Sequence, residues 1–211
     1  MTPARANSQI GGLDLARTRA GLAPWQTTAA PIGSDEYQQR LQRARTLMQE
    51  LGVDALLVTA GASLRYFSGI GWGASERLLG LLLTAQGTPI LICPAFETGS
   101  LERVLRIGVD VRTWDEHESP HALVASALRE RHAGSLALDP AAAYAVATRL
   151  RDALGNCRLA DASPIIDGCR MRKSTAELAL MQQACAMTLQ VQRLAAGVLH
   201  EGISNHELVR F

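Results

Sequence analysis

The chain has 211 residues, of which 47% are hydrophobic and 19% are charged, and its formal net charge at pH 7 is +1. This composition is typical of a folded globular protein, and so small a charge excludes nucleic acid or an anionic membrane as a partner held by bulk electrostatics. No apolar run approaches the ~20 residues of a membrane-spanning helix, and the opening residues lack the apolar core of a secretory signal, so we expect a cytoplasmic protein with no membrane contact.

The order of the predicted elements indicates an α/β protein. Residues 1–33 are broken by prolines and glycines and are expected to form an N-terminal arm. Helical spacing of apolar residues begins at Ser34, and Gly52 stands where a glycine commonly ends a helix. Strands are expected at 53–59, 78–84, 90–93, 109–113, 135–139 and 157–161, and helices near 96–106, 120–132 and 140–154. Strands and helices that alternate in this way favour an α/β fold.

Local capping signals mark the expected helix starts. The pairs Ser119-Pro120, Asp139-Pro140 and Ser163-Pro164 each place a capping side chain before a proline, which suits the first helical position. Ser174 and Glu177 form a capping box that opens a helix of about 25 residues. Gly202 should follow its end, and a second capping box, Ser204 with Glu207, opens a helix so short that we expect the chain to be the front portion of a longer protein.

The histidines and the cysteines were considered as possible metal or disulfide sites, and their spacing argues against both. His117 and His121 match the zinc motif H-E-x-x-H, but Pro120 lies between them and breaks the helix that the motif needs, so both histidines are expected on the surface. The four cysteines show no C-x-x-C spacing and are expected to be reduced and buried. The residues alone therefore predict a globular α/β domain followed by the start of a helical one.

Three stretches carry a resemblance to a known family. They are residues 40–69, with an aromatic-Ser-Gly segment; residues 170–188, with Arg170, Lys173 and Glu177; and residues 200–209, with Glu201, Gly202, Ser204 and Glu207. In this order they resemble the creatinase/prolidase/aminopeptidase P family of proline-directed metallopeptidases.

The resemblance implies a domain organisation and a chemistry. Residues 34–165 would form the family's N-terminal α/β domain, a mixed β-sheet flanked by helices, and residues 166–211 the linker and first helices of a truncated pita-bread catalytic domain. The intact protein would be an Xaa-Pro dipeptidase or an aminopeptidase P-like hydrolase that uses two divalent ions, with manganese as the expected metal. The family's metal ligands lie downstream, so no catalytic or metal-binding residue is assigned to this chain, which is expected to be inactive alone.

The resemblance also implies partners. A homodimer is expected, in which this domain pairs the subunits and restricts the partner's catalytic cleft to short proline-containing peptides. Two alternatives stay open: a creatinase-like amidinohydrolase, and a non-catalytic binding or assembly module of the same fold.

Residues 65–77 concentrate aromatic, glycine and arginine residues in a chain with only 4% aromatics. One interpretation is structural, with core aromatics beside a glycine-rich turn. The other takes Arg65, Tyr66, Trp72 and Arg77 as substrate-binding residues in the partner subunit's cleft. In it Arg65 binds the carboxylate of a dipeptide bidentately, Trp72 covers the proline ring, and Arg77 is a second candidate for the carboxylate.

Overall fold

The computed structural model describes residues 10–22, 24–25 and 28–211. It divides into two compact units, residues 32–172 and the described parts of 1–31 together with 173–211. Residues 1–9, 23 and 26–27 of the expected arm lie outside the described residues. The expected boundaries, with an arm over 1–33 and a second domain from residue 166, stay a prediction.

Residues 32–172 form a mixed sheet of six strands in the order β4-β3-β2-β1-β5-β6. The strands are β1 (Ala55–Thr59), β2 (Gly80–Thr84), β3 (Ile90–Pro94), β4 (Asp110–Trp114), β5 (Ser135–Leu138) and β6 (Arg158–Asp161). β2 runs antiparallel to β1 and β3, while the other neighbouring pairs are parallel. The predicted α/β class, with a mixed sheet flanked by helices, is confirmed.

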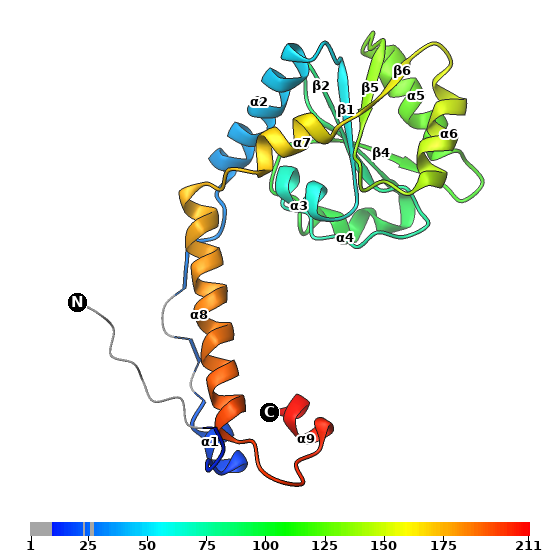
Figure 1. Ribbon diagram of the computed structural model, residues 1–211. Helices are drawn as coiled ribbons and strands as arrows, with labels where there is room; N and C mark the ends of the chain where they lie inside the picture. Colours follow the sequence, from blue (N-terminus) through cyan, green and yellow to red (C-terminus); the bar gives the residue numbers. More distant parts are fainter. Residues whose placement is uncertain (1–9, 23, 26–27) are drawn as a thin grey trace. The chain divides into compact units, whose positions relative to one another are not determined.

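Helices cover both faces of this sheet (Figure 1). One face carries α2 (Ser34–Glu50), α3 (Ala62–Ser68), α4 (Thr98–Glu102) and α7 (Ser163–Arg170), and the other carries α5 (Pro120–Glu130) and α6 (Tyr144–Leu154). The side chains of strand β1 are buried on both faces of the sheet. Leu56 and Val58 belong to the core cluster on one face, and Ala55 and Leu57 belong to the cluster on the other. A strand covered on both faces needs apolar residues at every position.

Of the three capping side chains predicted before a proline, Ser119 is confirmed. Ser163 is not a cap, because α7 begins at Ser163 itself and its N-cap residue, Ala162, makes no side-chain hydrogen bond. Ser119 caps α5 by accepting a hydrogen bond from the main-chain N–H of Ala122 at 3.2 Å. The expectation at Asp139-Pro140 is wrong, since α6 begins only at Tyr144. The Asp139 carboxylate instead accepts hydrogen bonds from the main-chain N–H groups of Ala141 at 2.9 Å and of Thr59 at 3.4 Å. It holds the turn between β5 and α6 and links it to β1, and it does not cap a helix.

Two further elements differ from the expectation. The helix expected near 96–106 is a 3₁₀ turn, η1 (Ala95–Glu97), followed by the short α4. Helix α3 (Ala62–Ser68), which carries Tyr66 and Phe67, was not among the predicted helices.

The second unit contains α1 (Leu15–Ala20), α8 (Thr175–Gly197) and α9 (Asn205–Arg210). Both predicted capping boxes are present, at the starts of α8 and α9. The main-chain N–H of Gly11 donates to the carbonyl of Ala196 at 2.9 Å, and that of Leu13 to Gly197 at 3.0 Å, so residues 10–13 are tied to the end of α8.

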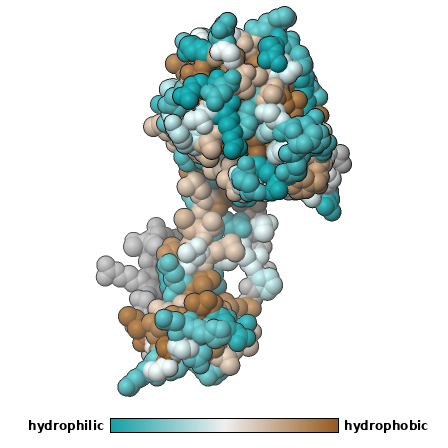
Figure 2. Space-filling view, turned by 90° about the vertical axis from the view of Figure 1, so that its right-hand side faces the viewer, coloured by the Kyte–Doolittle hydropathy of each residue, from teal (hydrophilic) through white to brown (hydrophobic). Residues whose placement is uncertain are grey.

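Helix α8 is largely uncovered. Gly197 is the buried residue of its 23, and apolar side chains such as Leu178, Leu189 and Val191 are about half exposed. Figure 2 shows apolar surface, in brown, on this unit in the lower part of the view. Among the described helices, none combines the length and the apolar character needed to cross a membrane.

Candidate functional site

Helix α3 carries the aromatic-Ser-Gly segment. It ends at Gly69, whose φ of 79° lies in the left-handed region. A Cβ atom at this position would lie 2.9 Å from the hydroxyl oxygen of Tyr37 and 2.7 Å from Cγ of Arg106. Both the backbone conformation and the close packing therefore require glycine here.

Tyr66 lies in the middle of a network on this helix. Its hydroxyl donates a hydrogen bond of 2.9 Å to the main-chain carbonyl of Cys169 on α7. The guanidinium of Arg40 lies 4.1 Å from the ring centroid and donates to the carbonyl of Tyr66 at 2.8 Å. Arg40 is itself 7% exposed and pairs with Glu36 at 2.6 Å. These contacts join α2, α3 and α7, and a role for Tyr66 in substrate binding stays a prediction.

Arg65 and Trp72 lie next to this network but differ in exposure. Arg65 is exposed, and within the part of the chain that the structure describes its side chain makes no hydrogen bond or ion pair. Trp72 is half-buried and packs against the apolar cluster beneath α2 and α3. Arg65 is therefore the available cation of this segment, and Trp72 has one side fixed by the core.

Arg77 is already paired. Its Nε atom donates to Glu116 at 2.7 Å, its Nη1 atom bonds Glu76, and its guanidinium lies 5.4 Å from the ring centroid of Phe96. The hydrogen bond with Glu116 raises the pKa of Arg77, which keeps the guanidinium charged. A carboxylate ligand at Arg77 would have to compete with two glutamates that belong to the chain.

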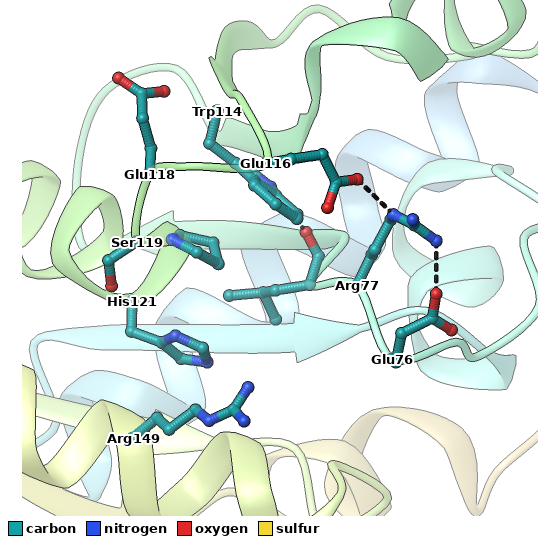
Figure 3. A pocket seen from close by; sticks show the side chains of 10 residues that line it. Glu76, Arg77, Trp114, Glu116, Glu118, Ser119, His121 and Arg149 are labelled. Carbon is teal, nitrogen blue, oxygen red and sulfur yellow. Dashed lines mark hydrogen bonds and ion pairs between the residues drawn. The ribbon is translucent and has the colours of Figure 1, made fainter.

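A pocket that the sequence did not predict lies beside Arg77 (Figure 3). It has a volume of about 360 Å³, and its lining includes Trp114, Ser119, His121 and Arg149. Trp114 is fixed in the wall because its indole N–H donates to the carbonyl of Leu78 at 3.0 Å. The lining residues are separated by up to 73 positions, from Glu76 to Arg149, so no local motif indicated the pocket.

The expectation that both histidines of the H-E-x-x-H match lie on the surface is wrong for His121. His117 is exposed, but His121 is 7% exposed because it lies in the first turn of α5, against the sheet. Helix α5 begins at Pro120, so His117 is outside it and the two rings do not share a helix face.

The family resemblance places the metal ligands downstream of this chain, and the described residues offer no alternative metal site. Among them no group of three or more His, Cys, Asp or Glu side chains is placed to hold a metal ion.

The fold agrees with comparisons to known proteins. The model of the creatinase/prolidase N-terminal domain matches residues 40–172. The chain belongs to this family, as the sequence motifs indicated.

Named relatives and solved structures are similar to this chain over most of its length. YkvY of Bacillus subtilis (strain 168), named as a candidate dipeptidase, is 25% identical over 173 residues, which are 81% of this chain and 47% of YkvY. The crystal structure of dipeptidase PepE from Mycobacterium ulcerans matches with a TM-score of 0.72 and 29% identity, over 86% of this chain and 49% of PepE. The crystal structure of a recombinant prolidase from Thermococcus sibiricus also matches with a TM-score of 0.72, at 24% identity over 82% of this chain and 47% of the prolidase. This match supports the fold. The chain thus spans about half the length of the curated relatives it matches.

Proposed function

We propose that this chain is the N-terminal portion of an Xaa-Pro dipeptidase or aminopeptidase P-like hydrolase, and that it serves subunit pairing and substrate gating. The observation that carries the proposal is the family match over residues 40–172, together with relatives that are named dipeptidases. Because those relatives extend well beyond the matched region, the hydrolytic step is assigned to residues outside this chain.

In this proposal the two divalent ions, with manganese expected, activate water in the catalytic half. The residues of this chain act on the substrate. Arg65 is the preferred group for the free carboxylate of a proline-ended dipeptide, because its guanidinium is exposed and unpaired within the described residues. An arginine can bind a carboxylate through two parallel hydrogen bonds.

Trp72 and Arg77 have supporting roles in the same proposal. Trp72 covers the apolar proline ring with the part of its indole that the core leaves exposed. Arg77 is a weaker carboxylate candidate, since Glu116 and Glu76 already bind it. Tyr66 positions Arg65 by fixing α3 against α7.

The test uses the intact protein that contains this chain. Hydrolysis of Gly-Pro is compared with that of Gly-Leu while Mn²⁺ is titrated, and the molar mass is measured by light scattering. Arg65→Ala should raise KM for Gly-Pro by about tenfold or more at unchanged molar mass, as expected for loss of a hydrogen-bonded charge pair.

The matched control is Arg129→Ala, which removes another exposed arginine, near the end of α5. It should leave KM unchanged. Hydrolysis of Gly-Pro by a monomer, or an equal KM in wild type and Arg65→Ala, would contradict the gating role. Failure to cleave any Xaa-Pro peptide would contradict the proposed activity itself.

A further inference from the structure

The pocket between α5 and α6 contains a buried polar atom without a partner. His121 is 7% exposed, and its Nε2 atom is buried with no hydrogen-bond partner among the described residues. Buried polar groups in native proteins almost always have such a partner, so an exception needs an explanation. Here the imidazole lines a pocket, which indicates that a ligand is the missing partner.

A second group faces the same space. Arg149 extends from α6, and Figure 3 shows its guanidinium beside the His121 ring, both directed into the pocket. Arg149 is exposed, and no hydrogen bond or ion pair of its side chain is found within the described part of the chain. A free guanidinium beside an unpartnered ring nitrogen favours an anionic ligand.

The N-terminus of α5 adds partial positive charge to the pocket. The helix has 11 residues, and its first turn, with Pro120 and His121, lines the pocket. The N-terminus of a helix carries partial positive charge and favours anions. The Ser119 hydroxyl, which caps the helix, also lines the pocket and can turn its own O–H toward a ligand.

The acidic residues of the lining are already engaged. Glu116 and Glu76 both bind Arg77, on the opposite side of the pocket from Arg149 (Figure 3). The carboxylate of Glu118 accepts a hydrogen bond from the main-chain N–H of Asp115 at 2.8 Å and points away from the histidine. The side of the pocket formed by α5 and α6 therefore carries positive charge that the chain does not neutralise.

We propose that this pocket binds a small oxyanion, a carboxylate or a phosphate, through the guanidinium of Arg149 and the Nε2–H of His121. Burial, and then the charge of Arg149, lower the pKa of His121, so the ring is neutral at pH 7 and can donate from Nε2 in the appropriate tautomer. Because Nε2 is shielded from solvent while Arg149 is exposed, binding through both groups requires Arg149 to change rotamer so that the oxyanion reaches the ring. The proposal does not rest on the proposed peptidase function, although Arg77 lines the same pocket.

The experiment measures binding to the 211-residue chain without any activity assay. The histidine ring signals are followed by NMR at pH 7 while inorganic phosphate, and separately succinate, is added at constant ionic strength. We expect a saturable shift of the His121 signals. Saturation by phosphate alone identifies a phosphate ligand, and saturation by succinate alone identifies a carboxylate.

Variants separate a specific site from a general charge effect. Arg149→Gln should weaken binding by about tenfold or more, because it removes the charged donor. Arg151→Gln, which removes an exposed arginine two positions along the same helix, should leave the affinity unchanged. Arg149 is exposed, so its substitution is not expected to unfold the chain.

A second pair of variants tests the histidine: His121→Gln removes the proposed donor, and His117→Gln, at an exposed position, is its control. Because His121→Gln lacks the ring whose NMR signals report binding, its affinity is measured by calorimetry. Loss of affinity in His121→Gln alone supports the site, provided that its far-UV circular dichroism matches the wild type. Shifts that do not saturate with either anion, or an equal loss in Arg149→Gln and Arg151→Gln, would overturn the proposal.

Discussion

The hydroxyl of Tyr66 donates a hydrogen bond of 2.9 Å to the main-chain carbonyl of Cys169, a residue 103 positions further along the chain. The bond joins α3 to α7 on the same face of the sheet, directly beside the exposed Arg65. This proposed substrate-binding arginine is thus carried by a helix whose position depends on a contact with a helix far away in the sequence.

Tyr66→Phe removes this bond and leaves a partly buried carbonyl without its donor. We expect a loss of about 1 kcal/mol in the free energy of unfolding, measured with urea, since such a bond contributes ~0.5–1.5 kcal/mol. Tyr144→Phe is the matched control, because Tyr144 is 81% exposed and should change stability little. Equal stability of both variants and the wild type would show that the Tyr66 bond contributes nothing.

Glu207 should titrate at unusually low pH. The main-chain N–H and the hydroxyl of Ser204 donate to its carboxylate at 2.9 and 2.7 Å, and these bonds lower its pKa below the ordinary 4.5. Because the folded-state pKa is the lower one, the contribution of the capping box to stability is complete above pH 4.5 and is lost as the pH falls through the folded value. Carboxyl ¹³C NMR measures this pKa directly.

Ser204→Ala tests the cause of that shift. It removes the hydroxyl donor and the cap of α9, while the main-chain N–H of residue 204 still donates to the carboxylate, so the pKa of Glu207 should return part of the way toward its ordinary value. A Glu207 that titrates at 4.5 or above in the wild type would contradict the capping box in solution.

Local signals in the sequence predicted local structure well. Ser119-Pro120 and the two capping boxes were confirmed, because each acts through residues three positions apart on its own helix. The buried strand predicted from the apolar run at residues 53–59 was confirmed as β1, because a strand that is covered on both faces needs apolar residues at successive positions.

Features that depend on distant residues could not be predicted in this way. Asp139 resembled a helix cap, but one of its oxygens accepts from Thr59, which is 80 positions away in the sequence and lies at the end of the neighbouring strand β1. The burial of His121 and its place beside Arg149 depend on how α5 and α6 pack. The sequence suggested Arg77 as a second carboxylate candidate after Arg65, and it gave no sign that Arg77 pairs with Glu116 through a tertiary contact.

The reactivity of the four cysteines should differ sharply. The expectation that all are buried is wrong for Cys185, which is exposed on α8, and Cys157 is partly exposed. Burial raises the pKa of Cys169 to about 11, and it also raises the pKa of Cys93 and of Cys157. With Ellman's reagent at pH 8 we therefore expect one fast-reacting thiol, since the thiolate is the reactive form. Cys185→Ser should remove the fast phase, and a fast phase that survives this substitution would contradict the assignment.

Gly80 tests the packing of the central sheet. It faces Thr59 in the β1–β2 pair, and an added Cβ atom would lie 2.8 Å from the carbonyl oxygen of Val58 and 3.2 Å from Cδ1 of Leu57. The backbone at Val58 cannot move without disturbing the ladder, so Gly80→Ala should lower the free energy of unfolding by about 1–3 kcal/mol, the usual cost of overpacking. Gly71→Ala is the matched control, because no atom lies within 4 Å of its added Cβ, and it should stay within about 0.5 kcal/mol of the wild type. If Gly80→Ala proved as stable as Gly71→Ala in urea, the close approach of β1 and β2 at this position would be incorrect.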